Sequence, residues 1–229
     1  MSRIRRVYQA RFRAVLEALH ARRLEQGVER LFGRASQLSQ QEGISLTHAL
    51  VRIHDRISQR VPGRPLQARS PRPGPVLFYC DAGLGGLARW LRAAGYDAVW
   101  DPGIDDNCLV REAGRLRATV LTTDSLLMER RVLRDGLIPA FWVPPTLKVS
   151  EQLALVFREY GLTVGEPRCM RCGGELVPVD KEAMRERIPP KTWRWLDEYF
   201  VCSRCDQLFW KGTHWRRIAN QLGALEARA

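Results

Sequence analysis

The chain has 229 residues, 45% of them hydrophobic, and its 37 lysines and arginines outnumber its 25 acidic residues to give a net charge of +12. No stretch approaches the ~20 consecutive apolar residues of a membrane span, so we expect a soluble, cytoplasmic protein without membrane contact. The positive charge favours a polyanionic partner, with an ordinary arginine-rich helix surface as the alternative.

The N-terminal residues 1–61 are predicted to form a basic α-helical arm. Residues 1–75 hold 15 arginines against 5 acidic residues, so most of the net charge lies there. Apolar residues recur at helical spacing over 3–32, as one long or two shorter helices, and again after Ser45, a predicted helix cap. We expect Arg5 and Arg6 to contact RNA, with docking onto a protein or self-association through 1–61 as the alternative.

A linker and an α/β domain follow the helical arm. Residues 62–75 contain five prolines and almost nothing to bury, which predicts an extended linker. Over 76–162, short apolar runs at 76–80, 98–100, 119–122 and 140–143 alternate with helical patterns, one of them from about Ser125. This alternation predicts a parallel sheet with helices on both faces.

Acidic residues stand where ligands bind in such sheets. Asp81 follows the first strand, Asp124 follows the third, and Asp105 and Asp106 precede a helix. Because ligands bind outside the carboxyl ends of parallel strands, we expect Asp81, Asp106 and Asp124 to converge on Mg²⁺ or Mn²⁺, the hard cations that carboxylates prefer. Asp105 is an additional candidate. Helix capping and ordinary strand-end positions are the alternatives.

The loop after the first strand contains Gly83, Gly85 and Gly86, whose spacing does not fit the dinucleotide-binding pattern GxGxxG. We expect these glycines to let the backbone turn tightly beside metal and phosphate. Arg89, a candidate catalytic residue, and Arg92 follow on the next helix, where each could reach substrate phosphate or remain solvated.

Two CxxC pairs, Cys169 with Cys172 and Cys202 with Cys205, predict a zinc ribbon over residues 163–217, followed by a tail at 218–229. Paired disulfides are the alternative. Basic and aromatic residues of the ribbon are candidate RNA contacts: Lys211, His214 and Arg216, with Trp193, Trp195, Trp210 and Trp215 either stacking on bases or packing the core. We expect core packing for at least two of the tryptophans.

Three motifs in order resemble the PIN-like ribonucleases of the Mut-seven C-terminal family. They are FYCDAGLGGLARWLRAAGYD at 78–97, the Asp105-Asp106 pair followed by LTTD at 121–124, and FWKGTHW at 209–215. The resemblance implies a PIN-like fold, metal-dependent RNA cleavage, metal-binding acids at Asp81, Asp106 and Asp124, and a C-terminal zinc ribbon. It covers about 76–216 and leaves the helical arm outside.

The chain departs from the family pattern at three positions, where it has Gly83, Thr123 and Ser125 instead of the frequent Met, Arg and acid. Loss of one acid weakens a second metal site. The sequence therefore predicts a metal-dependent endoribonuclease acting on RNA, with transfer or ribosomal RNA as candidates. A non-catalytic RNA-binding or ribosome-associated factor is the main alternative, and a DNA- or nucleotide-directed phosphoesterase is a third.

Overall fold

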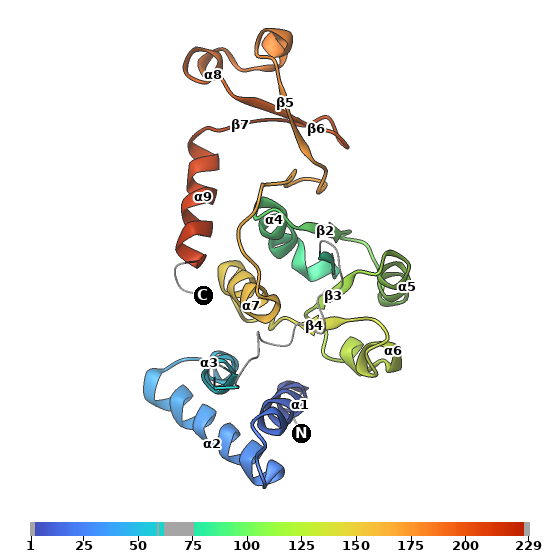
Figure 1. The fold of residues 1–229 in the computed structure, drawn as a ribbon, viewed down its shortest axis with the longest axis vertical. Helices are drawn as coiled ribbons and strands as arrows, with labels where there is room; N and C mark the ends of the chain where they lie inside the picture. The colour runs from blue at the N-terminus through green and yellow to red at the C-terminus, as the bar shows by residue number, and fades with distance from the viewer. Residues whose placement is uncertain (1–2, 59, 62–75, 227–229) are drawn as a thin grey trace. The chain divides into compact units, whose positions relative to one another are not determined.

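The computed structural model describes residues 3–58, 60–61 and 76–226 (Figure 1). The chain divides into two compact units, one combining Met1–Pro71 with Thr122–Gly161 and the other combining Arg72–Leu121 with Leu162–Ala229. The predicted linker at 62–75 lies outside the described residues, and the domain limits expected from the sequence stay a prediction. None of the helices in the described ranges has the length and hydropathy needed to cross a membrane.

The first unit contains a three-helix N-terminal segment and a later segment with one strand. Its elements are α1 (Arg3–Ala18), α2 (Leu24–Glu42), α3 (Leu46–Ser58), η2 (Leu127–Glu129), α6 (Arg131–Arg134), β4 (Ala140–Trp142) and α7 (Val149–Tyr160). The pattern over 3–32 thus belongs to two helices. The helix expected from about Ser125 is instead broken into the short turns η2 and α6.

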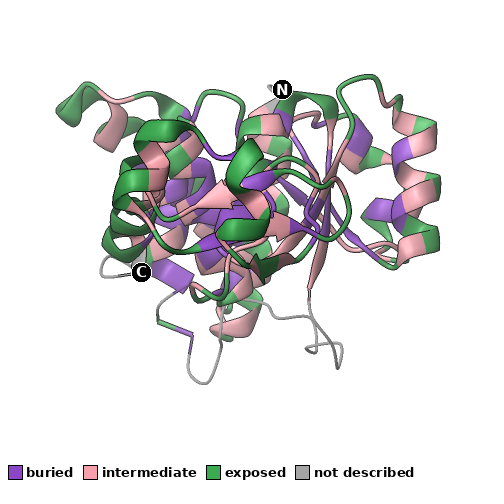
Figure 2. Cartoon of the chain, turned by 90° about the horizontal axis from the view of Figure 1, so that it is seen from above, coloured by how far each residue is buried: buried purple, intermediate pink, exposed green. Residues whose placement is uncertain are grey.

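The three N-terminal helices form because each has one apolar face. Tyr8, Phe12 and Val15 recur at helical spacing on α1 and are buried. Figure 2 shows helices that carry both buried and exposed residues. Gly43, with a φ of 63°, ends α2, and the hydroxyl of Ser45 accepts a hydrogen bond from the His48 N–H at 3.3 Å, which confirms the predicted cap.

The N-terminal helices pack against the later segment of the same unit. The Tyr8 ring meets the Trp142 ring edge-on at 6.3 Å, and the Arg11 guanidinium lies 4.3 Å from the centre of the Phe141 ring. Arg158 of α7 forms an ion pair with Asp55 of α3 at 2.9 Å. These mostly buried contacts show that α1–α3 belong to a folded unit. The helices therefore do more than supply the positive charge of the predicted arm.

The second unit begins with alternating strands and helices: β1 (Leu77–Cys80), η1 (Ala82–Leu84), α4 (Gly85–Ala93), β2 (Asp97–Trp100), α5 (Asp106–Leu116) and β3 (Thr119–Thr122). Within this unit β1 pairs in parallel with both β2 and β3, which gives the strand order β2-β1-β3. The chain therefore passes from β1 to β2 on one side and then returns to β3 on the other side. This reversal creates a topological switch point between β1 and β3.

The cysteine-containing part of the second unit is a small antiparallel sheet with a modest core. Its elements are β5 (Leu176–Val179), η3 (Glu182–Arg187), α8 (Pro190–Trp195), β6 (Tyr199–Cys202) and β7 (Leu208–Trp210), in the strand order β5-β6-β7. Ile188, Tyr199 and Leu208 are buried at its centre, with Trp193 and Trp210 packed against them. This confirms core packing for two of the ribbon tryptophans. Trp195, in contrast, is 82% exposed.

The chain from residue 218, expected to be a tail, is instead the continuation of helix α9 (Thr213–Glu226). Trp215, Ile218 and Leu222 recur at three- and four-residue spacing, and Leu222 is buried. An apolar stripe of this kind stabilises a helix by packing it against a neighbouring surface. The predicted α/β class, with a helical N-terminal segment and a four-cysteine ribbon, is confirmed.

The two CxxC loops are copies of one backbone turn. In the first, the Cys169 N–H donates to Gly174 O and the Gly173 N–H donates to Cys169 O. In the second, the Cys202 N–H donates to Gln207 O and the Asp206 N–H donates to Cys202 O. The turn requires a left-handed residue directly after its second cysteine, and Gly173 and Asp206 have φ values of 80° and 56° there.

Replacing Gly173 with alanine should destabilise the second unit by about 2 kcal/mol. A side chain at this φ is strained, and a Cβ would lie 2.8 Å from the Asp97 carboxylate. Gly223→Ala is the control, because nothing lies within 4 Å of its Cβ position and alanine favours the helix. Urea unfolding of the zinc-loaded proteins measures both effects, and equal midpoints for the two variants would contradict the turn argument.

Candidate metal centre and catalytic site

The four cysteines of the CxxC pairs come together in space. Their Sγ atoms all lie within 4.8 Å of one another, with 3.6 Å between Cys169 and Cys205 and 3.4 Å between Cys172 and Cys202. Among the described residues, these four cysteines are the group of potential metal-binding side chains that lie close enough together to share one metal ion.

The donor set and spacing of this group fit zinc. A tetrahedral ion with Zn–S bonds of about 2.3 Å places its sulfur atoms roughly 3.8 Å apart. The observed sulfur distances are slightly below this value and far above the ~2.05 Å of a disulfide bond. All six cysteines are free thiols in the structure, and the alternative of paired disulfides is therefore not observed.

The surrounding backbone prepares the thiols unequally for ionisation. Burial raises the pKa of the Cys169 thiol to about 12. Burial also opposes ionisation of Cys202, but hydrogen bonds from the N–H groups of Arg204 and Cys205 and from the neighbouring thiols together outweigh it and lower its pKa to about 7. A metal ion must displace the remaining thiol protons, so metal affinity should fall as the pH falls.

Arg92 fastens the first cysteine loop to the α/β part of the second unit. Its side chain is only 3% exposed, and its guanidinium donates to Ala98 O at the start of β2 and to Met170 O and Arg171 O between the first two cysteines. Burial lowers the pKa of Arg92 from its usual value. This position gives Arg92 a structural role in place of the RNA contact expected from the sequence, because the side chain is buried and its Nε and Nη1 groups donate to backbone carbonyls.

Asp81 lies at the switch point of the sheet. It directly follows β1, and its N–H donates to Leu121 O of β3 at 2.9 Å. The carboxyl ends of β1 and β3 therefore meet beside it, which is where open α/β sheets place their ligands. Its side chain is half-buried and precedes the turn that leads into helix α4.

The paired acids at the start of α5 have different environments. Asp105 is the helix cap: its carboxylate accepts from the N–H groups of Asn107 and Cys108 at 2.8 and 3.0 Å. Hydrogen bonds involving Cys108 lower its pKa. Asp106 is the first residue of the helix and is half-buried. A carboxylate in this first turn also interacts favourably with the helix dipole.

Asp124 belongs to the first unit, two residues after β3. Its N–H donates to the Thr122 hydroxyl at 2.9 Å and its carboxylate accepts from the Leu126 N–H at 2.7 Å, which fixes a tight turn. Ser125, at the position where the family often has an acid, is only 9% exposed. Because Asp81 and Asp106 lie in one compact unit and Asp124 in the other, the convergence of the three carboxylates stays a prediction.

The expected RNA contacts other than Arg92 are surface residues. Arg89, Lys211, His214 and Arg216 are exposed, and Lys211 forms an ion pair with Glu198 at 2.5 Å. In the first unit, Arg5 pairs with Glu29 at 2.5 Å and Arg6 pairs with Glu129 at 2.9 Å. Exposed pairs of this kind are weak, so phosphate can compete for these arginines.

The sequence reasoning missed Trp100, which supports the loop after β1. Its indole N–H donates to Ala82 O at 3.1 Å, and a Cβ on Gly85 would lie 2.6 Å from its ring. Gly85 has an ordinary helical φ of −58°, so this glycine serves the close approach of Trp100 and not a special turn. Two features of the sequence indicate this contact: the aromatic residue at the end of β2, and the adjacent glycines at 85 and 86, which leave room for its ring.

A family model described as Mut7-C RNAse domain matches residues 76–222, well over half of the chain. Searches of curated proteins and of solved structures gave no match. The matched range includes Asp81, both CxxC pairs and most of α9. The chain therefore belongs to the Mut7-C RNase domain family.

Proposed function

We propose that this protein is a metal-dependent endoribonuclease that hydrolyses RNA phosphodiesters. The observation that carries the proposal is the position of Asp81 at the switch point between β1 and β3, in a chain of an RNase family. Together with Asp106 and Asp124, it offers the hard oxygen ligands suited to Mg²⁺ or Mn²⁺. When bound, such a cation supplies Lewis-acid activation of water and neutralises charge at the phosphodiester.

The remaining roles belong to the chain's own residues. Asp105 holds the first turn of α5 through two backbone N–H groups and so positions Asp106 next to it. Arg89 is exposed on α4, the helix that follows the Asp81 loop. We propose that it contacts a substrate phosphate. The proposed substrate is transfer RNA or ribosomal RNA. The proposed location is the cytoplasm, because a reducing compartment keeps the four cysteines as thiols that can bind a metal ion.

A non-catalytic RNA-binding or ribosome-associated factor is the second candidate. The observation that favours it is the nearly buried serine at position 125, where an additional acid would be needed to complete a two-metal site. A divalent-metal titration separates the two candidates. An enzyme needs Mg²⁺ or Mn²⁺ to cleave RNA, whereas a binding factor holds the same RNA equally well without them.

Asp81→Asn should lower RNA cleavage more than about a hundredfold while leaving RNA affinity and the unfolding midpoint nearly unchanged, because it removes one charged ligand. The measurement is cleavage of a transfer RNA pool in Mg²⁺ or Mn²⁺. Asp101→Asn is a matched control: Asp101 directly follows β2 as Asp81 follows β1, and its carboxylate accepts the Gly103 N–H of a turn. Equal activity in both variants would remove the catalytic assignment.

We further propose that the four-cysteine group holds a structural zinc ion. Cys202→Ser should reduce bound zinc and lower the unfolding midpoint of the second unit, because its ribbon has only a small core of its own. Cys108→Ser is the control, since Cys108 lies outside the four-cysteine group. Elemental analysis and thermal unfolding measure both effects. Zinc content unchanged by Cys202→Ser but lost in Cys108→Ser would contradict the assignment.

The N-terminal helices are proposed to add RNA affinity through exposed arginines. Replacing Arg5 and Arg6 together with glutamine should flatten the slope of log affinity against log salt by roughly 0.7 per lost contact with single-stranded phosphate. Arg111 and Arg115 on α5, replaced in the same way, provide a charge-matched comparison. An unchanged slope in the first variant would favour a protein-docking or self-association role for residues 1–61.

A further inference from the structure

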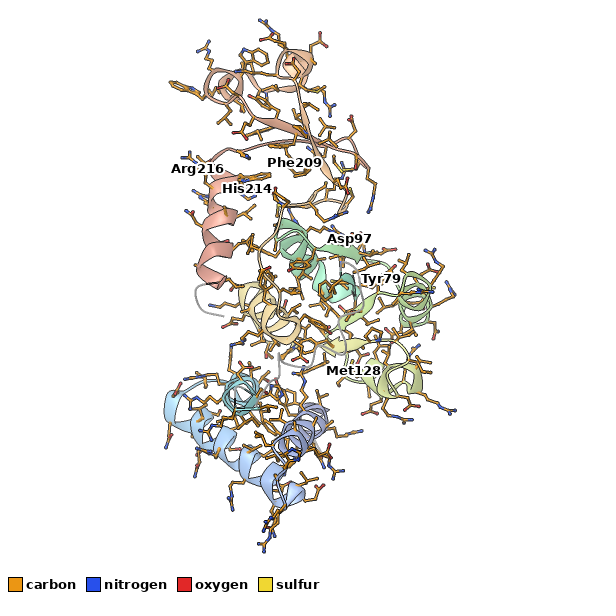
Figure 3. All side chains as sticks on the ribbon, in the orientation of Figure 1. Tyr79, Asp97, Met128, Phe209, His214 and Arg216 are labelled. Carbon is orange, nitrogen blue, oxygen red and sulfur yellow. The ribbon has the colours of Figure 1, made fainter. Side chains whose placement is uncertain are left out.

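The second unit contains a large pocket that the proposed chemistry does not use. Its volume is about 850 Å³, and its walls come from α4, the segment 164–171, strand β7 and helix α9. Figure 3 shows two labelled wall residues, Phe209 on β7 and His214 in the first turn of α9. A pocket of this size can enclose a group as large as a nucleotide.

The lining of this pocket, which we call the ribbon pocket, combines aromatic rings with positive charge. Trp100, Phe209, Trp210 and Trp215 contribute ring surface. Among the lining residues Glu166 supplies one carboxylate. Five lining residues are basic: Arg89, Arg92, Arg168, Arg171 and Lys211. Arg92 is committed to backbone carbonyls, but Arg89, Arg171 and Lys211 are exposed. This combination of ring surface and exposed positive charge complements a ligand that joins an aromatic ring to negative charge.

Trp100 links the ribbon pocket to the loop that begins with Asp81. The same indole that lines the pocket donates to Ala82 O, the carbonyl next to Asp81, and packs on Gly85 at the start of α4. Arg89 also lines the pocket from α4, the helix that follows the Asp81 loop. A group held in the pocket therefore contacts a side chain that is hydrogen-bonded directly beside the proposed catalytic acid.

We propose that the ribbon pocket binds one unstacked base of single-stranded RNA next to the phosphodiester that is cleaved. The base stacks on the aromatic wall, and the adjoining phosphates face Arg89, Arg171 and Lys211. Every nucleobase has a face that can stack, and phosphates pair with exposed arginine and lysine, so this site tolerates many sequences but requires an unpaired nucleotide. The inference rests on the proposed function and specifies its substrate class.

Filling the pocket tests this assignment most directly. Ala219 of α9 lines the pocket and Asn220 does not, so Ala219→Trp should occlude it while Asn220→Trp places the same side chain outside. Binding is measured in the Asp81→Asn background without added Mg²⁺, by fluorescence anisotropy of a labelled ten-nucleotide oligouridylate and of an RNA duplex of the same length. Ala219→Trp should weaken oligouridylate binding at least about tenfold and duplex binding much less, and Asn220→Trp should change neither.

A second filling variant protects the test against misfolding. Gly223 also lines the pocket and has no atom within 4 Å of its Cβ position, so Gly223→Phe can enter the same space from the next turn of α9. Zinc content and the unfolding midpoint of each variant are compared with the parent protein. Arg89→Gln should flatten the salt dependence of oligouridylate binding, whereas Arg194→Gln, an exposed ribbon arginine outside the pocket, should not.

Oligouridylate affinity that both filling variants leave unchanged would overturn the pocket assignment, and so would equal losses for oligouridylate and duplex. These binding results are independent of cleavage. Pocket-dependent binding without metal-dependent cleavage in the parent protein would support the base site and contradict the nuclease proposal. Metal-dependent cleavage by the parent protein, together with unchanged oligouridylate binding by the filled variants, would support the nuclease proposal and contradict the base site.

Discussion

The buried guanidinium of Arg92 is the interaction on which the second unit depends. One side chain bridges the end of the α4–β2 connection and the backbone between the first two cysteines, through bonds of 2.7–3.1 Å. Breaking it would leave buried carbonyls without their donor, a cost of ~1–3 kcal/mol for each group. The N–H of Arg168 donates to Arg92 O and adds a second link, so the metal-binding loop and the sheet with Asp81 form one unit.

These hydrogen bonds attach the small ribbon to the part of the unit that carries the proposed catalytic acid Asp81. The ribbon buries few residues of its own and relies on four thiols and on Arg92 for its place. Trp100 continues the connection from the ribbon pocket to the loop beside Asp81. The four-cysteine group, the ribbon pocket and the loop that holds the proposed catalytic acid are therefore connected within one folded unit.

Much of the fold was predictable because local patterns and tertiary packing agree. The strand ending at Asp81, the helix starting at Asp106 and the cap by Asp105 all follow from periodicity and capping rules. Arg92 could not be predicted, since an arginine on a helix is usually solvated and only the tertiary fold brings three carbonyls around it. Helix α9 is indicated by the three- and four-residue spacing of Trp215, Ile218 and Leu222, although its last residues resemble a polar tail.

We propose that the carboxylates of Asp81, Asp106 and Asp124 together bind a divalent cation, and that the four cysteines hold a separate zinc ion. Anomalous diffraction from crystals of the full chain grown with Zn²⁺ and Mn²⁺ tests it most directly, because the two ions scatter differently. We expect zinc among the four cysteines and manganese held by Asp81, Asp106 and Asp124. Ordered zinc with no manganese at these acids, or carboxylates too far apart to share an ion, would contradict it.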